Sequence, residues 1–151
     1  MATAIYAGFW RRFAAAFIDA IVTAVGSVLF GVPVLVLMML VVVAEGEEPD
    51  PVALTAVFEG AAQLLALFFS WMYFALMESS RLQATPGKLA LGIKVTDLDG
   101  NRVGFERATW RYFGKFVSAL LLLGGFLMAA FSARRQALHD RMAGCLVVDR
   151  E

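Results

Sequence analysis

The chain is poor in the residues that form covalent and metal cross-links. It contains one cysteine, Cys145, and one histidine, His139, among 151 residues. A single cysteine excludes an intramolecular disulfide and a cysteine-based zinc site, and a lone histidine excludes a histidine-rich metal cluster. We therefore expect neither a bound metal ion nor another cofactor.

Charge is also scarce. Only 17% of the residues are charged, against about 25% in an average soluble domain, while 60% are hydrophobic. This composition excludes a disordered chain. The balance of 13 basic and 13 acidic residues offers no basic surface for nucleic acid, so we expect no nucleic-acid partner. The length suits a single domain, which we place at residues 5–149.

Basic residues are absent from one long stretch. No Lys or Arg occurs between Phe13 and Ser80, although seven acidic residues lie there. The bases gather at Arg11 and Arg12 and again from Arg81 onward. The net charge of zero thus conceals a segregation that is typical of membrane proteins, whose cytoplasmic segments carry an excess of Lys and Arg.

Two hydrophobic runs are long enough to cross a membrane. Residues 20–44 carry no charge, and a helix of that length covers about 37 Å, more than the hydrocarbon core of about 30 Å. Residues 60–77 form a second uncharged run, which residues 54–58 extend. We predict transmembrane helices at about 13–44 and 54–78.

The charge distribution orients these helices. Residues 45–51 are acidic and contain two prolines, so they form a loop, and their lack of bases places this loop outside the cell. Arg11 and Arg12 place the N-terminus in the cytoplasm, and the base-rich segment 79–115 returns the chain there. Membrane lipids are therefore expected partners.

A third hydrophobic run, residues 116–133, leaves two topologies open. A full crossing would put the bases of the C-terminal segment 134–151 outside, against the charge rule. A turn at Gly124 and Gly125 would instead return the chain as a re-entrant segment, which is tolerated only where protein buries it.

Two β-like segments favour the re-entrant topology. Residues 93–97 alternate like a strand and lead into the turn sequence 99–101, and residues 145–148 are a further β-like run. An isolated hairpin is marginal in water, so we expect the last run to add a third strand. The predicted fold is an all-α integral membrane protein with two transmembrane helices, a third hydrophobic segment and a small cytoplasmic β-element.

Asp19 stands out because it lies within the first span. An intramembrane carboxylate costs about 2.5–3.5 kcal/mol on insertion scales, so it should face a partner or a wet cavity. Arg12 lies within about 20° of the same helix face, and Thr23 and Ser27 continue the polar stripe. Small and hydroxyl residues also favour helix packing, but packing does not need a charge. Asp19 and Arg12 are candidate ion- or proton-binding residues.

The second span carries a polar stripe of its own, made of Glu59, Gln63, Ala66, Ser70 and Tyr73. We expect the two stripes to face each other, away from lipid. In the alternative, Glu59 simply lies at the membrane interface.

His139 and Asp140 follow the third hydrophobic run. Histidine is the side chain whose unperturbed pKa lies near neutrality, so the pair is a candidate proton relay. The alternative is a solvated helix end with its bases near lipid headgroups.

The sequence contains no arrangement that predicts catalysis. Thr85-Pro-Gly-Lys88 lacks the earlier glycine of a nucleotide P-loop, so we interpret it as a helix start, with Thr85 as N-cap and Pro86 in the first turn. We find no nucleophile with a base and an orienting group, no paired carboxylates in register and no metal-ligand spacing. An enzyme is not expected.

Four sequence blocks, in this order along the chain, resemble the motifs of a known family. They are Gly8-Phe-Trp-Arg-Arg-Phe-Ala-Ala-Ala-Phe-Ile-Asp19, Gln83-Ala-Thr-Pro-Gly-Lys88, Gly92-Ile-Lys-Val-Thr-Asp-Leu-Asp-Gly100 and Arg135-Gln-Ala-Leu-His-Asp140. Together they resemble the bacterial RDD family, named for one arginine and two aspartates. The resemblance implies that Arg12 is the arginine, with Arg11 as the competing choice, and that Asp19 and Asp140 are the aspartates. Cys145 departs from the pattern, since relatives more often have a small hydroxyl residue there.

The resemblance implies a multi-pass protein of the bacterial cytoplasmic membrane, in a family suspected of transport. Our first hypothesis is a homo-oligomer that moves a cation or proton, with Asp19 as the binding carboxylate. Arg12 would counter Asp19, and His139 with Asp140 would form a cytoplasmic proton entry. The second hypothesis is a structural or adaptor protein, whose polar residues lock the fold and whose basic cytoplasmic element docks a partner or lipid.

Overall fold

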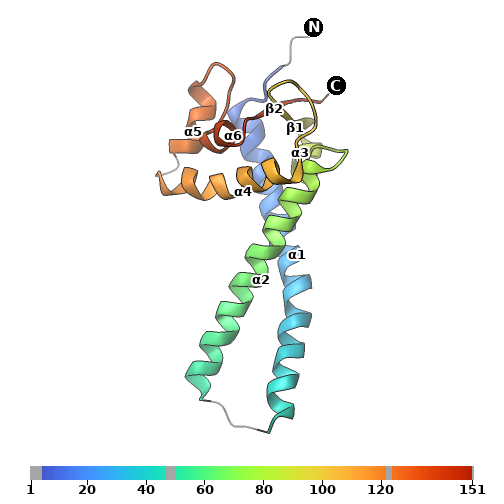
Figure 1. Cartoon of the computed structure of the whole chain (residues 1–151), viewed down its shortest axis with the longest axis vertical. Coiled ribbons are helices and arrows are strands. Elements are labelled where there is room, and N and C mark those ends of the chain that lie inside the picture. The colour runs from blue at the N-terminus through green and yellow to red at the C-terminus, as the bar shows by residue number, and fades with distance from the viewer. Residues whose placement is uncertain (1–4, 47–49, 122–123, 151) are drawn as a thin grey trace. The chain divides into compact units, whose positions relative to one another are not determined.

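The computed structural model describes residues 5–46, 50–121 and 124–150 and is mainly helical (Figure 1). In chain order its elements are α1 (Phe9–Ala44), α2 (Pro51–Ser79), α3 (Pro86–Ala90), β1 (Ile93–Asp97), α4 (Phe105–Leu120), α5 (Gly124–Phe131), α6 (Leu138–Met142) and β2 (Cys145–Asp149). The two predicted transmembrane helices are confirmed as α1 and α2, which both begin a few residues earlier than predicted. The acidic segment that connects them lies partly outside the described residues.

Both long helices suit a membrane. They contain 36 and 29 residues, or about 54 and 43 Å at 1.5 Å per residue, so each exceeds the hydrocarbon core of about 30 Å. In the most apolar stretch of each helix, almost no residue is fully buried within the chain. Unburied apolar surface of this extent would be unfavourable in water, and lipid is the environment that accommodates it.

Local sequence signals explain where α1 ends and where α2 begins. Gly46 follows α1 with a φ of +70°, a conformation that glycine adopts readily after a helix end. Asp50 precedes α2, and its carboxylate accepts hydrogen bonds from the backbone N–H groups of Val52 and Ala53 at 3.4 and 3.2 Å. Pro51 occupies the first helical position, where its missing N–H carries no cost.

The chain divides into two compact units. One comprises the residues up to Ala20 together with those from Trp71 onward, and the other comprises Ile21–Ser70. In the second unit the two helices meet at Gly26, where an added Cβ would lie 2.4 Å from the ring of Phe69. Phe69 also stacks on Phe30, with ring centroids 6.0 Å apart.

The predicted pairing of the two polar stripes is found at Asp19, which accepts a hydrogen bond from the Tyr73 hydroxyl of α2 at 2.8 Å, but not at Glu59 and Gln63. Glu59 and Gln63 are exposed on α2, whereas Thr23 and Ser27 on α1 are half-buried. The contact between the helices is made by an aromatic ring against a glycine, because the missing Cβ of Gly26 provides the space that Phe69 fills.

The first unit contains the β-element. β1 pairs with β2 in antiparallel register, from Ile93 opposite Asp149 to Asp97 opposite Cys145. The extended N-terminus joins β2 through a bridge between Tyr6 and Val148. The pairing of the C-terminal run with residues 93–97 is confirmed, but the predicted hairpin is wrong. After the turn at Asp97–Asn101 the described chain forms no second hairpin strand, and β2 takes that place.

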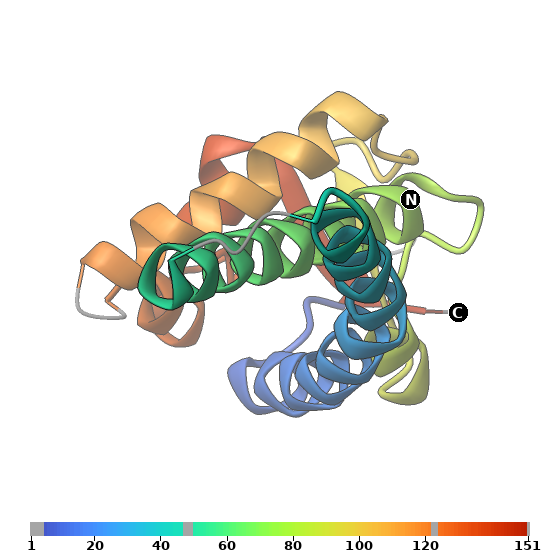
Figure 2. The ribbon, with the colours of Figure 1, turned by 90° about the horizontal axis from the view of Figure 1, so that it is seen from below.

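This sheet constrains the topology. Hydrogen-bonded strands must lie on the same side of a membrane, so the N-terminus, β1 and the C-terminus share one side. Between β1 and β2, α4 and α5 differ in direction by 102° and pack side by side (Figures 1 and 2). With eight residues, α5 covers only about 12 Å. Strand pairing therefore supports the re-entrant alternative for the third hydrophobic run.

Candidate functional site

The site is a cluster of buried charged side chains in the first unit. Its first ion pair joins α1 to α6: the Arg12 guanidinium donates through Nη1 to Asp140 Oδ2 at 2.5 Å and through Nε to the Ala7 carbonyl at 3.1 Å. Asp140 is completely buried. Arg11 instead pairs with Asp149 at 2.6 Å, and both of these side chains are partly exposed. Of the two arginines, Arg12 is therefore the one that pairs with Asp140 in the buried cluster.

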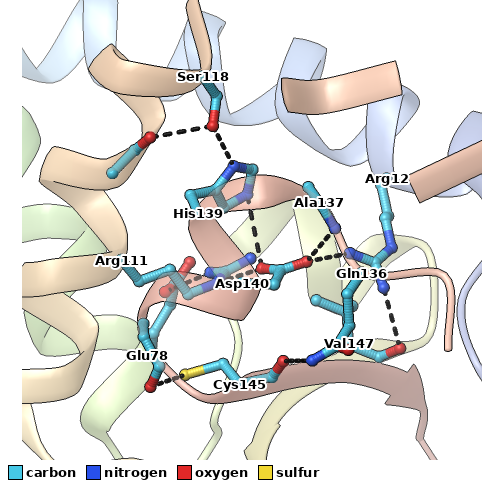
Figure 3. Close-up of polar contacts among 12 residues, drawn as sticks. Arg12, Glu78, Arg111, Ser118, Gln136, Ala137, His139, Asp140, Cys145 and Val147 are labelled. Carbon is cyan, nitrogen blue, oxygen red and sulfur yellow. Dashed lines mark hydrogen bonds and ion pairs between the residues drawn. The ribbon is translucent and has the colours of Figure 1, made fainter. Parts of the chain in front are cut away.

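Arg111 of α4 continues the cluster. It lies between two carboxylates, donating through Nε to Asp140 at 2.7 Å and through Nη1 to Glu78 at 2.5 Å (Figure 3). The second oxygen of Glu78 accepts a hydrogen bond from the Lys88 ammonium. The resulting ion-pair chain alternates in sign and takes one residue from each of five helices, in the order Arg12, Asp140, Arg111, Glu78 and Lys88.

The electrostatics follow from this alternation. Burial alone would raise the pKa of Asp140, but Arg111, His139 and Arg12 outweigh it and hold that pKa below its usual range. Burial lowers the pKa of Lys88, although Glu78 opposes the shift. Asp140 is therefore ionised at neutral pH, and its charge is balanced by the arginines around it.

Asp19 forms a second centre. Its side chain is 1% exposed, and it accepts hydrogen bonds from the Tyr73 hydroxyl at 2.8 Å, the Thr85 hydroxyl at 2.5 Å and the Gly87 N–H at 2.8 Å. An added Cβ on Gly87 would lie 2.2 Å from the Ala15 carbonyl oxygen and 2.8 Å from the Asp19 carboxylate. Only glycine allows α3 to approach α1 so closely.

This contact gives the Thr85-Pro-Gly-Lys88 segment its role. Thr85 precedes α3 and Pro86 opens it, as the sequence predicts. The Thr85 side chain, however, does not cap the helix but donates to Asp19. The next residues then serve both centres, since Gly87 binds Asp19 and Lys88 binds Glu78.

The predicted pairing of Arg12 with Asp19 is wrong, because Arg12 has a different partner. The ion pair of Arg12 is with Asp140, and the segment that binds Asp19 reaches the same chain of charges through Lys88. Arg12, Asp19 and Asp140 therefore all belong to one compact unit. Thr23, Ser27, Glu59 and Gln63 belong to the other unit.

His139 is buried and is neither a solvated helix end nor a group that titrates near neutrality. Its Nδ1 lies 3.3 Å from the Ser118 hydroxyl, and its Nε2 lies 3.5 Å from Asp140 Oδ1. Burial lowers the pKa of His139 to about 3, even though Asp140 opposes the shift. The imidazole is therefore neutral at physiological pH, so the expected proton entry through His139 is not supported.

Lys115 adds a fourth cation to the cluster. Its ammonium lies 3.5 Å from the centroid of the Phe74 ring and 5.7 Å from that of Tyr112, which is a cation–π arrangement. Loss of hydration lowers the pKa of Lys115, although Glu78 opposes the shift. Including this residue, the first unit places together four cations (Arg12, Lys88, Arg111 and Lys115) and three carboxylates (Asp19, Glu78 and Asp140).

Sequence reasoning missed Glu78 and Arg111 as site residues. Both lie beside hydrophobic runs, where they count simply as charged flanks, and 33 positions separate them. One signal was available: Arg111, Lys115 and Ser118 are spaced by four and three residues and share one helix face. Among the described residues, no group of His, Cys, Asp and Glu could hold a metal ion.

Comparisons with known proteins agree with the motif blocks. A sequence model of the RDD family matches residues 6–144. The chain is 33% identical to the "Uncharacterized protein YxaI" of Bacillus subtilis (strain 168), over 94% of this chain and 96% of that protein. No solved structure matches the chain significantly. With the family match spanning Arg12, Asp19 and Asp140, the chain belongs to the RDD family.

Proposed function

We propose that this RDD protein moves a cation or a proton across the bacterial cytoplasmic membrane as a homo-oligomer, with Asp19 as the binding carboxylate. The observation that carries the proposal is the position of Asp19. It is buried on a membrane-length helix and is held by the hydroxyls of Tyr73 and Thr85 and the N–H of Gly87. Carboxylates inside membrane helices are costly and mark ion or proton paths.

The surface of the long helices supports an oligomer. The most apolar stretches of α1 and α2 contain almost no fully buried residue, and two spanning helices are too few to enclose a pathway. Glu59 and Gln63 are exposed on α2. A second copy packed on this face would remove both polar side chains from lipid.

The charge pattern supports a cytoplasmic N-terminus. Arg11, Arg12 and the bases from Arg81 onward belong to the unit that holds both termini, whereas residues 21–70 contain no base. In this orientation Asp19 lies near the cytoplasmic end of α1, where the ion-pair chain adjoins it through α3.

Flux measurements on proteoliposomes test the proposal. Wild-type protein should move protons or alkali cations, detected with an internal pH dye under imposed Na⁺, K⁺ or pH gradients. Asp19→Asn should abolish this flux while oligomer size and yield stay unchanged. The matched control is Asp99→Asn, which removes an exposed carboxylate from a turn. Equal flux from wild type and Asp19→Asn would remove Asp19 from the mechanism.

The ion-pair chain favours a second candidate, a structural or adaptor protein without transport. Its five residues lock five helices together, and each of its carboxylates is already paired. On this reading, Asp19→Asn lowers yield and thermal stability, and wild-type proteoliposomes show no flux above protein-free vesicles. The basic cytoplasmic surface would then dock a partner or lipid. Under either candidate we propose a non-enzymatic role.

A further inference from the structure

The helix α4 has its polar side turned inward. Arg111, Tyr112 and Ser118 are buried, whereas large apolar side chains are exposed along the opposite face. The exposed set is Phe105, Trp110, Phe113, Phe116, Val117 and Leu120. A helix on the surface of a water-soluble protein shows the reverse pattern. Beyond the charged first turn with Glu106 and Arg107, the outer face of α4 is therefore suited to an apolar environment.

α5 extends this apolar surface. Leu127 and Phe131 are exposed on it, and Phe131 at its end is 87% exposed. The pairing of β1 with β2 returns the chain to its starting side, so α4 and α5 do not cross. An apolar face that enters from one side and returns fits a single leaflet of a bilayer.

A surface pocket follows directly after Phe131. It has a volume of about 320 Å³ and is lined by Ser132, Ala133, Arg134, Gln136 and Arg141. Two of these side chains stabilise the loop itself. The Ser132 hydroxyl accepts from the Gln136 N–H at 2.7 Å, and the Gln136 side chain donates to the Cys145 carbonyl at 2.9 Å.

Two arginines of the pocket are free to bind a ligand. The guanidinium groups of Arg134 and Arg141 are exposed, and they make no hydrogen bond or ion pair with the rest of the chain that the structure describes. Arg135, between them in the sequence, is committed elsewhere: it donates to the Tyr6 carbonyl at 3.3 Å and has a φ of 48°. The loop thus presents two unpaired cations next to an exposed aromatic ring.

We propose that this pocket binds the phosphate of an anionic phospholipid whose acyl chains lie along the exposed apolar face of α4 and α5. Guanidinium groups hold phosphate oxygens through charge-assisted hydrogen bonds. A free phosphate would use the arginines but not the apolar face, and a second copy of the chain would use the face but leave the arginines unexplained. A phospholipid satisfies both. The inference does not depend on ion movement.

Lipid titration of the full-length protein tests the pocket. Native mass spectrometry or thermal shift in detergent should show binding of phosphatidylglycerol and little binding of phosphatidylcholine. Each surface arginine contributes about 1 kcal/mol toward an anionic lipid, so Arg134→Gln with Arg141→Gln should weaken binding about 25-fold. The control is Arg102→Gln, which removes an exposed base from outside the pocket and should leave the affinity unchanged.

Other outcomes overturn the proposal. An unchanged affinity in the double variant would remove the pocket from lipid binding. Inorganic phosphate that binds as tightly as the lipid would make the site a free-anion site. Because both arginines are exposed and unpaired, the double variant should fold normally, and its melting temperature without lipid checks this.

The apolar face has an independent readout. A spin label at Leu120→Cys, on the most exposed part of α4, should be accessible to oxygen and shielded from a polar nickel reagent in vesicles. A label at Asn101→Cys should show the opposite. Cys145 is buried and does not compete for labelling. Labels at Leu120 that are shielded from both reagents would show protein packing, as in a second copy, and would overturn the lipid assignment.

Discussion

At the scale of residues, the family signature resolves into two different carboxylate sites. Asp140 is surrounded by cations, whereas the hydrogen bonds to Asp19 come from two hydroxyls and a backbone N–H. Arg111 has the largest share in the first site because it serves two carboxylates at once. Removing one partner of a buried ion pair leaves an uncompensated charge, and that cost exceeds the net value of the pair.

Replacing Arg111 should therefore be severely destabilising. We expect Arg111→Met to lower the free energy of unfolding by about 3–5 kcal/mol, because Glu78 and Asp140 would stay buried with one cation fewer. The control, Arg11→Met, breaks a partly exposed pair with Asp149 and a hydrogen bond to the Leu91 carbonyl, and it should cost only about 1–2 kcal/mol. Denaturant unfolding in detergent measures both, and similar small losses would contradict the buried network.

His139 gives the protein a defined response to acid. Its pKa is about 3 in the folded state and about 6.5 when unfolded, so the unfolded chain binds the additional proton between these values. Stability should fall as the pH drops below about 6.5, by about 1.5 kcal/mol for this residue between pH 6.5 and 5. Asp140, whose pKa is lowered from 3.8, adds a further loss at lower pH.

Melting curves at pH 6.5 and pH 5 measure this response. The difference in melting temperature should shrink in His139→Asn, which cannot titrate, and should persist in the control variant Asp99→Asn. An equal acid response in wild type and His139→Asn would show that the imidazole is accessible to water in the folded state.

At the scale of elements, long hydrophobic runs were predictable because a membrane-spanning length is a property of the sequence itself. α1, α2 and the start of α3 at Pro86 follow from local signals. α4 was not predicted as a separate helix, because its first eleven residues were assigned to the base-rich cytoplasmic segment 79–115 and the rest to the hydrophobic run 116–133. Arg111 and Lys115 are turned toward Glu78 and Phe74, residues that only the tertiary fold brings near.

The same limit applies to the site. Arg12, Asp19 and Asp140 were identified through motif blocks and an intramembrane carboxylate. The partners of these residues were not, because the pairs are separated by up to 128 positions and no local pattern specifies them. Glycine positions show this well, since the close approach at Gly87 is invisible in a segment that equally suits a simple helix start.

Gly87 should control how α3 docks on α1. In Gly87→Ala the new methyl group would lie 2.2 Å from the Ala15 carbonyl oxygen, so α3 must move away from α1. The hydrogen bond from the backbone N–H of residue 87 to the Asp19 carboxylate would then be lost. We expect a loss of about 1–3 kcal/mol in unfolding free energy. Gly60→Ala, within α2, is the control, because nothing lies within 4 Å of an added Cβ there. Equal stability of the two variants would contradict the close approach.

At the scale of the whole molecule, the sheet determines the topology more firmly than hydropathy does. Hydropathy alone left residues 116–133 as a third crossing or a re-entrant segment. β1 and β2 flank that segment in sequence and are hydrogen-bonded along five residue pairs. Since no membrane can separate two paired strands, this pairing favours an even number of crossings.

Reporter fusions should therefore place both termini in the cytoplasm. Green fluorescent protein should fluoresce when fused to either end, and alkaline phosphatase should be inactive after the C-terminus. Phosphatase inserted next to Asp50, between α1 and α2, should be active, because the acidic connection lies on the other side. An active phosphatase at the C-terminus would require β2 to leave β1 and Tyr6, and it would replace the re-entrant pair α4 and α5 with a third crossing.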